Sequence, residues 1–504
     1  MRGNNLKKRS QIIRKCKNSI KKRLKRKSYK DQPEPIMAGT NIHYEMGDKT
    51  RAMSYGGIGA IHKMVKQIGL DKEIDNLELL KAHVPYHESD HVLNIAYNVL
   101  VGGKRLEDIE LRRNDEVFMN AIGAERIPDP TTAGDFTRRF QKKDLVLLMD
   151  YINNAREKVW SKAPRGLMEE AIIDVDGTLA GTLGECKEGM DISYKGIWGY
   201  HPLIISLANT NEVLYLVNRS GNVVSHDGAA EWIDRAIALV SPHSKKILVR
   251  GDTDFSLTAN FDRWSELVDF VFGMDACKGF VTRAEALEEA RWEPLMRKPK
   301  YEVLTEEREK PENFKERIVI ERNFDNIRLN SEDVAEFEYS PGKCENSYRM
   351  VVVRKNLSVE KGAQVLFDDI RYFFYITTRR DLTAAEVVEH ANKRCNQENV
   401  IEQVKNGVNA MRMPVEDLES NWAYMIIATL AWNLKAWFGL LMPNRMRRTQ
   451  ILKMEFRRFL NTFILIPCQI ICTGRKIVYR LLGYNEGLKD FFAAFEKIRR
   501  LQFE

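Results

Sequence analysis

The sequence has few of the features that mark export, disulfide cross-linking or nucleotide hydrolysis. Its seven cysteines are odd in number and include no Cys-x2-Cys pair, so a reduced, cytosolic compartment is the simplest inference. Neither a GxxxxGK[ST] phosphate loop nor a GxSxG nucleophile motif is present. We therefore expect neither ATP dependence nor serine catalysis, and we predict no metal site among the nine histidines.

Acidic residues are absent from residues 1–30, which contain fourteen Lys or Arg; because the whole chain carries +8, the remainder carries −6. This arm lacks the continuous apolar core of a secretion signal. We expect it to be loose alone, helical on a polyanion, and in contact with nucleic acid; a membrane-surface arm and a solubilising tail are the alternatives. The cations that we assign to DNA contact are Lys7, Lys8, Arg9, Lys21, Lys22 and Arg23.

Long apolar runs are also scarce. The segment NWAYMIIATLAWNLKAWFGLLM, residues 421–442, is apolar enough to raise a membrane span, but Asn421, Asn433 and Lys435 interrupt it and no second span follows. We predict a buried helix and no membrane association. The overall composition, with 44% hydrophobic and 30% charged residues over 504 positions, is that of a globular protein with more than one domain.

Residues 55–165 have the apolar periodicity of helices, as in IHKMVKQIGL and LVLLMDYINNAREKVW. Within them, IPDPTTAGDFTRRF is typical of a helix start, with Pro130 near its N-terminus and Arg138 and Arg139 further on. We interpret this region as a helical DNA-binding module in which Arg138 and Arg139 contact DNA. A plain helical support domain is the alternative.

From Ala171 the pattern changes to strands. AIIDVDGT, KGIWGYHPLIISLANT, EVLYLVNRSGN, KKILVRGDTDFS and VDFVFGMDA predict strands, while HDGAAEWIDRAIALVS and FDRWSELV predict helices. Strands that meander and then alternate with helices indicate a mixed α/β sheet with helices packed on it.

Two of these strands end on carboxylates that a sheet could bring side by side. Asp174 and Asp176 end the first, and Asp252 and Asp254 follow KILVRG. Residues two apart in a strand share a face, so periodicity does not separate the members of each pair. We favour Asp176 beside Gly177, and Asp252 directly after its strand, as ligands of Mg²⁺, which prefers carboxylate, water and phosphate oxygens.

The segment ANKRCNQENVIEQVK, residues 391–405, predicts a helix that carries a third carboxylate. Intervals of four and seven residues would place Arg394, Glu398 and Lys405 on one face, with Glu398 reaching a metal ion and the two cations meeting DNA phosphates. A solvated face with ordinary ion pairs is the alternative.

Taken in order, AIIDVDGT, HPLIISLANTNEVLYLVNRSGNV, ILVRGDTDF and the Arg-x3-Glu-x6-Lys segment resemble the DDE transposases of bacterial insertion sequences. The likeness is greatest to the insertion-sequence thirteen-eighty family, near the larger "four" group, over roughly residues 80–480. It implies an RNase H-like core with a catalytic, metal-binding triad on Asp176, Asp252 and Glu398. The chain departs from the pattern at Ala391, where relatives have Tyr, and at Asp254, where they have a small residue; Glu402 is the alternative carboxylate.

The 146 residues between Asp252 and Glu398 exceed what such a core needs, and ERIVIERNF, YRMVVVRK and RYFFYITT indicate a β-rich insertion whose last strand returns to the main sheet. Trp292 could stack on an unpaired DNA base there; a core or surface tryptophan is the alternative. The predicted domains are a basic flexible arm and linker (1–45), a helical DNA-binding domain (46–168), the core's first part (169–275), the insertion (276–368), the core's second part (369–440) and a basic C-terminal region (441–504).

The predicted function is therefore a transposase that binds insertion-sequence ends and, with Mg²⁺ or Mn²⁺, cleaves DNA and transfers strands. Its expected partners are the terminal inverted repeats, the target DNA and a second copy of the chain, and its expected location is the bacterial cytoplasm at the nucleoid. An RNase H-like nuclease without joining activity and a non-catalytic DNA-binding regulator are the alternatives.

Overall fold

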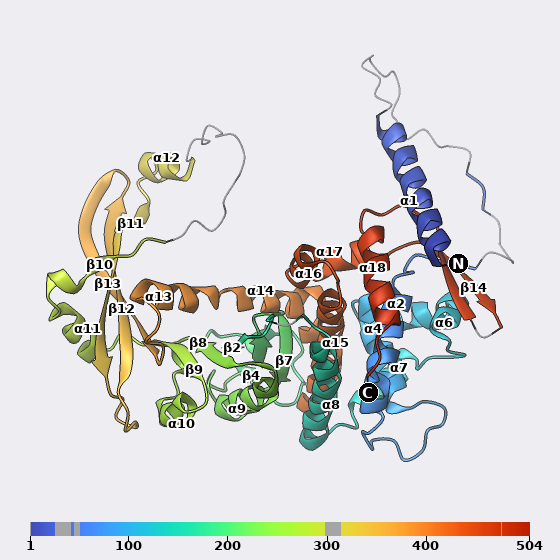
Figure 1. The fold of residues 1–504 in the computed structure, drawn as a ribbon. Coiled ribbons are helices and arrows are strands. Elements are labelled where there is room, and N and C mark those ends of the chain that lie inside the picture. Colours follow the sequence, from blue (N-terminus) through green and yellow to red (C-terminus); the bar gives the residue numbers. More distant parts are fainter. Residues whose placement is uncertain are drawn as a thin grey trace. The chain divides into compact units, whose positions relative to one another are not determined.

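The computed structural model describes residues 2–25, 42–44, 51–164, 166–297, 314–474 and 476–503. Two compact units are present (Figure 1). Unit 1 comprises Met1–Ala163, Glu185–Glu188 and Glu402–Glu504, and unit 2 comprises Pro164–Gly184 and Gly189–Ile401. Unit 1 thus joins both ends of the chain, and unit 2 contains most of its middle.

Unit 1 is mostly helical, as the apolar periodicity predicts. In the second helix, Ile58, Ile61, Val65 and Ile68 recur three or four residues apart and are all buried. The main helices are α1 (Arg2–Leu24), α2 (Ile58–Ile68), α3 (Leu70–Ile74), α4 (Glu88–Leu100), α5 (Ile109–Arg113), α6 (Glu116–Ile122), α7 (Pro130–Thr137), α8 (Lys142–Ser161), α15 (Leu418–Leu440), α16 (Arg445–Leu452), α17 (Phe456–Phe459) and α18 (Leu488–Arg499). A small antiparallel sheet has the order β1 (Ala52–Met53), β14 (Cys468–Thr473) and β15 (Lys476–Leu481).

The long apolar run forms α15, which is buried on all sides and packs against α4, α8 and α16. Asp417 caps it by accepting from the Ser420 backbone N–H at 2.8 Å. Lys435 is buried too; its Nζ donates to the Leu452 carbonyl at 2.8 Å and lies 3.8 Å from the centre of the Trp432 ring. The prediction of a buried helix is confirmed, and no helix in the described part of the chain is long and apolar enough to cross a membrane.

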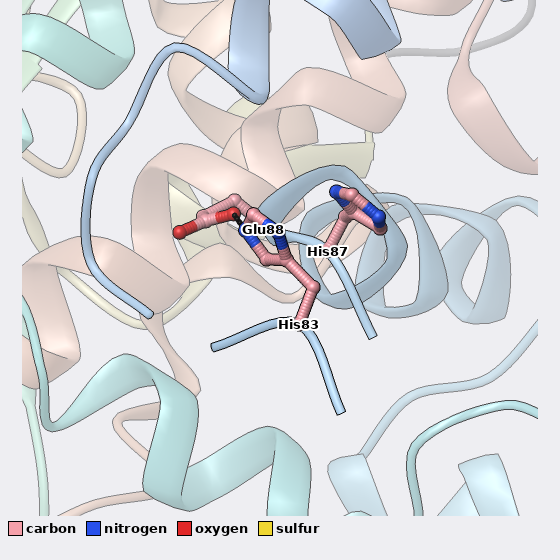
Figure 2. A group of neighbouring side chains, drawn as sticks. All are labelled: His83, His87 and Glu88. Atoms are coloured by element: carbon pink, nitrogen blue, oxygen red, sulfur yellow. Dashed lines mark hydrogen bonds and ion pairs between the residues drawn. The ribbon is translucent and has the colours of Figure 1, made fainter. Parts of the chain in front are cut away.

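The loop before α4 brings three polar side chains together (Figure 2). His83 and His87 are exposed, and Glu88, the first residue of α4, is buried. One Glu88 oxygen, Oε1, accepts from the backbone N–H groups of Leu79 and Leu80 at 3.1 and 2.9 Å. The other, Oε2, lies 3.0 Å from His83 Nε2. Glu88 therefore ties this loop to the start of the helix.

The basic arm contains helix α1, which packs against α18. Arg9 lies over the Phe492 ring of α18 at 4.9 Å and forms an ion pair with Glu496 at 3.4 Å. The linker within the predicted arm, residues 26–41 and Glu45, lies outside the described residues.

Unit 2 is built on a nine-stranded mixed sheet. Five strands, in the order β7 (Glu212–Val217), β6 (Leu203–Leu207), β2 (Glu170–Gly177), β8 (Lys246–Gly251) and β9 (Asp269–Met274), form its core. The strand β2 is antiparallel to β6 and parallel to β8, while β6 pairs antiparallel with β7 and β8 parallel with β9. Helix α9 (Ala229–Val240) packs on β2, β6 and β7. Three antiparallel strands followed by two parallel ones are the arrangement of an RNase H-like core, so the predicted fold class is confirmed.

The β-rich insertion continues this sheet. Strand β13 (Gln364–Thr377) pairs with β9 from Phe374 to Thr377, which confirms that RYFFYITT returns to the main sheet, and β12 (Tyr348–Lys361), β11 (Asp325–Tyr339) and β10 (Glu293–Pro294) follow outward. The prediction of a strand in ERIVIERNF is wrong: most of it lies in helix α12 (Phe314–Glu321). Trp292 is buried with Arg354 over its ring at 4.3 Å, so it belongs to a core.

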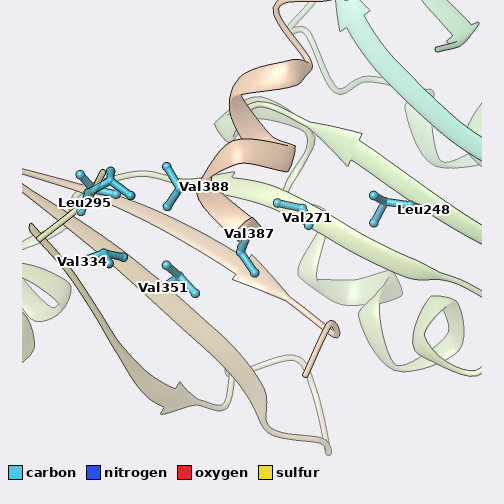
Figure 3. Close-up of a cluster of buried hydrophobic side chains, with 8 residues drawn as sticks. Leu248, Val271, Leu295, Val334, Val351, Val387 and Val388 are labelled. Carbon is cyan, nitrogen blue, oxygen red and sulfur yellow. The ribbon is translucent and has the colours of Figure 1, made fainter. Parts of the chain in front are cut away.

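A hydrophobic cluster spans the core strands and their extension (Figure 3). Helix α13 (Ala384–Lys393) places Val387 and Val388 against it, and Thr383 and Glu386 form the capping box that starts this helix. Full burial of a valine contributes about 1.5 kcal/mol or more, so the cluster holds α13 firmly on the sheet. Its other members are Leu248, Val271, Leu295, Val334, Val351 and Val353.

Candidate active site

The two aspartates of β2 have different surroundings. Asp174 is buried, and its two oxygens accept from Arg250 Nε and Nη2 at 2.7 and 2.8 Å. Arg250 Nη1 also donates to the His390 carbonyl at 2.9 Å, which ties β8 to the end of α13. Asp176 is partly exposed, and its Oδ2 accepts one hydrogen bond from Arg394 Nη1 at 2.9 Å. Both oxygens of Asp174 are thus bound by Arg250 in the interior, whereas Asp176 is the more accessible carboxylate.

Asp252 follows β8 and is close enough to Asp176 for their charges to interact. Burial raises the pKa of Asp176 to about 6, and the charge of Asp252 adds to this while Arg394 opposes it. Burial also raises the pKa of Asp252, with Asp254 and Asp275 adding to the effect and Arg394 opposing it. Asp252 Oδ1 accepts from the Asp254 backbone N–H at 3.1 Å, while the Asp254 side chain is exposed. Two carboxylates at neighbouring strand ends therefore disfavour each other's ionised form.

Arg394 balances this negative charge. Burial opposes its ionisation, but the charges of Asp176 and Asp252 outweigh that effect and raise the pKa of Arg394. It stands in a turn between α13 and α14 (Asn396–Glu402), where Arg394 and Cys395 donate to the carbonyls of Ala391 and Asn392. The prediction of one uninterrupted α-helix over residues 391–405 is therefore wrong, since the α-helical hydrogen bonding is interrupted at Arg394 and Cys395 and gives way to a π-helix at Gln403–Gly407.

Glu398 lies in the first turn of α14 and is exposed. Its neighbour Gln397 is buried and donates from Nε2 to the carbonyls of Asp174 and Ile204 at 3.0 and 3.1 Å, which docks α14 on β2 and β6. Within the described ranges, the one set of three potential ligands within 4.8 Å of one another is His83, His87 and Glu88. The structure thus brings Asp176, Asp252 and Arg394 together, and it places Glu398 on the adjoining helix α14 with an exposed side chain.

Residues 39–503 match the family described as transposase DDE domain group 1. The chain belongs to the DDE transposases. Among solved structures, the chain is similar to the piggyBac transposase in a synaptic complex with hairpin DNA. The sequence identity is 12% and the TM-score 0.35, with 81% of each chain covered, and a likeness at that level carries no conclusion. No curated protein matches the sequence.

The family identifies the protein as an enzyme that acts on DNA, and DDE transposases generally use divalent metal ions. The residues of this transposase fit such an ion. Asp176 and Asp252 offer oxygen ligands at one sheet edge, and their mutual repulsion is what a nearby cation relieves.

Two further side chains of the transposase lie at the exit of β2 and were missed by the sequence analysis. A Cβ atom on Gly177 would lie 2.7 Å from His201 Nε2 and 3.6 Å from Arg219 Nη2. Arg219 is buried, donating through Nε to the His201 carbonyl and through Nη1 to the carbonyls of Ser225 and Asp227, while its Nη2 has no hydrogen-bond partner among the residues that the structure describes. The sequence signal was Gly177, because only glycine leaves room for these side chains beside Asp176.

The cations assigned to DNA contact have varied surroundings. Arg138 and Arg139 are exposed after α7, and Arg138 pairs with Asp135 at 2.8 Å. Lys405 is partly buried in the π-helix of unit 1. In α1, Arg9 contacts α18, Lys7 has a side chain outside the described part, and the exposed members are Lys8, Lys21, Lys22 and Arg23.

The histidine cluster was also missed by the sequence analysis, which predicted no metal site among the histidines. Its signal was present: His83 and His87 are separated by three residues, and Glu88 follows directly.

Proposed function

We propose that this chain is the transposase of a bacterial insertion sequence, akin to the thirteen-eighty family near the "four" group, and that it cleaves the element's ends and joins them to target DNA. The observation that carries this proposal is the interaction of Asp176 with Asp252 at the ends of two neighbouring parallel strands. Such a pair is costly to ionise, so its presence at a sheet edge favours a role with cations.

In this proposal Asp176, Asp252 and Glu398 hold Mg²⁺, for which Mn²⁺ can substitute. A bound divalent cation would supply Lewis-acid chemistry at the scissile phosphate and at the attacking and leaving oxygens. Gln397 keeps Glu398 near the strand ends by docking α14 on β2 and β6. Asp252 is preferred to Asp254 because the charge of Asp252 reaches both Asp176 and Arg394.

Arg394 and Arg219 contribute positive charge to the site. Arg394 offsets part of the negative charge of the two carboxylates, and in this proposal it contacts a DNA phosphate that approaches them. Arg219 Nη2 is a buried donor beside Gly177 that no described residue accepts from, and a phosphate oxygen would satisfy it. His201 Nε2 lies at the same strand exit.

The proposed partners are the terminal inverted repeats, target DNA and a second copy of the chain, since joining two ends favours a dimer on DNA. The exposed Arg138 and Arg139 and the cations of the arm are the proposed duplex contacts, acting through phosphate neutralisation. Lys405 is a further proposed contact to a DNA phosphate. The bacterial cytoplasm, at the nucleoid, is the corresponding location.

The test is cleavage of a duplex that carries the element's own end, measured with Mg²⁺, with EDTA, and with the Glu398→Gln variant in Mg²⁺. We expect cleavage only by the unaltered chain with Mg²⁺, and transfer of pre-cut ends to a target duplex. Equal cleavage by Glu398→Gln would remove Glu398 from the site. Cleavage without transfer of pre-cut ends would favour a nuclease, and binding without cleavage in every condition would favour a regulator.

A further inference from the structure

We propose that His83, His87 and Glu88 form a second metal site in this protein, for a divalent transition-metal ion of the zinc type. The possible ligand atoms of these residues all lie within 4.8 Å of one another (Figure 2). The site is in unit 1, whereas Asp176 and Asp252 are in unit 2. The proposal is independent of the catalytic assignment.

The buried carboxylate of Glu88 is the first argument. Its side chain is only 1% exposed, and Oε1 is held by the backbone N–H groups of Leu79 and Leu80. Its other oxygen meets only the Nε2 of His83 among the described residues. Burying a carboxylate is costly unless positive charge compensates it, and imidazole provides a full charge only when protonated. A divalent cation between Glu88 and the histidines would supply that charge permanently.

The donor set is the second argument, because it selects the kind of ion. Two imidazoles and one carboxylate suit Zn²⁺ and similar ions, whereas Mg²⁺ takes oxygen ligands almost exclusively. Zn–N and Zn–O bonds of about 2.0–2.1 Å put neighbouring ligand atoms of a tetrahedral site about 3.3 Å apart. The 3.0 Å between His83 Nε2 and Glu88 Oε2 is already close to this separation. Three protein ligands leave one position for water or another ligand.

The third argument is that the backbone around the site is already fixed. The His87 N–H donates to Asp90 Oδ2 at 2.9 Å, and the Ser89 N–H donates to Asp75 Oδ1 at 2.9 Å. The imidazole rings of His83 and His87 stack with centroids 4.0 Å apart and planes 19° apart. Binding therefore requires little ordering of the chain, which favours affinity. A bound ion would fasten the loop ending at His87 to the start of α4.

The test uses the full chain, freed of metal and kept in excess Mg²⁺, titrated with Zn²⁺ against a chromophoric chelator. The comparison is among the unaltered protein, His83→Ala/His87→Ala, each single variant, and the control His226→Ala, which removes an exposed histidine elsewhere. We expect the unaltered chain and the control to bind one Zn²⁺ more than the double variant. Each single variant should lower the affinity for this Zn²⁺ at least roughly tenfold, because substituting even a residue that only hydrogen-bonds to a metal ligand typically lowers metal affinity by that factor.

Exposed cysteines also bind zinc, so the ligand type is measured with Co²⁺ absorption. The signal lost in the double variant should be that of nitrogen and oxygen ligation without thiolate charge-transfer bands. Equal zinc stoichiometry and affinity in the unaltered and double-variant chains would overturn the proposal, as would loss of a thiolate signal alone. Should the double variant fail to fold, His87→Ala decides the matter, because it leaves the hydrogen bond between His83 and Glu88 in place.

Discussion

Strand β2 carries two aspartates that each pair with an arginine, Asp174 in the protein interior and Asp176 at the end of the strand, and the two pairs differ in burial and in hydrogen bonding. Asp174 and Arg250 are buried and joined by two short hydrogen bonds. Asp176 and Arg394 are each about one-sixth exposed and joined by one, and Asp252 competes for the same arginine. A pair locked on all sides serves stability, whereas a partly accessible pair with excess negative charge can exchange its cation.

The largest effect that this comparison predicts is on cleavage by Asp176→Asn. Removing this carboxylate should slow cleavage at least roughly 10⁴-fold, or about 5 kcal/mol of activation free energy, while binding to the element's ends stays within about twofold. Rates on a labelled end duplex and a binding titration measure the two effects. Cleavage near the unaltered rate would place Asp176 outside the catalytic set.

The matched variant, Asp174→Asn, should act on stability instead. It leaves the buried Arg250 without a charge partner, which costs about 3–5 kcal/mol of unfolding free energy. Urea denaturation of the two variants side by side measures this cost. A loss of stability in Asp176→Asn as large as that in Asp174→Asn would erase the distinction between the pairs.

The pH dependence of stability should sharpen the contrast. Because the folded-state pKa of Asp176 is raised from 3.8 to about 6, the folded chain holds this proton more tightly than the unfolded chain. Its contribution to stability is complete below about pH 4 and is lost as the pH rises to about 6, a difference of about 2–3 kcal/mol. In EDTA, the unfolding free energy of Asp176→Asn should therefore rise relative to that of the unaltered chain between about pH 4 and pH 6, and the difference should stay constant at higher pH. A difference independent of pH would contradict the raised pKa.

The smallest predicted effect belongs to Gln397→Ala. Two hydrogen bonds between α14 and the strands disappear, at a cost of about 1–2 kcal/mol. We expect kcat to fall about tenfold with little change in KM for DNA, because Gln397 orients the helix that bears Glu398 without contacting substrate. A rise in KM at constant kcat would instead indicate a role in holding DNA.

The strands of the core were predictable because each is an apolar run that ends abruptly on polar residues, as β2 does at Asp176 and β8 does after Gly251. The same periodicity could not separate Asp174 from Asp176, which share a face of the strand. Only the position of Arg250, 76 residues away in the sequence, makes one of them interior.

Local patterns also failed where tertiary contacts decide the backbone. ERIVIERNF has β-branched residues yet lies largely in α12, since a short apolar run fits helix and strand alike. The break between α13 and α14 leaves no mark in the apolar pattern, because the contacts made there are polar: Arg394 donates to Asp176, and Gln397 donates to carbonyls of β2 and β6. The loop residue His83 meets Glu88 through the path of the loop, which periodicity does not describe.

The pairing of β13 with β9 has a mechanical consequence. Among the described residues, the long ribbon β11–β12–β13 pairs its backbone with the core strands from Phe374 to Thr377 of β13. Its partner β9 is the direct neighbour of β8, which ends at Gly251, just before Asp252. A displacement at the far end of the ribbon would be transmitted along its hydrogen-bonded backbone to the pairing of β13 with β9. From there it would reach β8 and Asp252, because β8 is the next strand. The position of the ribbon β11–β12–β13, and of anything bound to it, is thereby coupled to the position of Asp252.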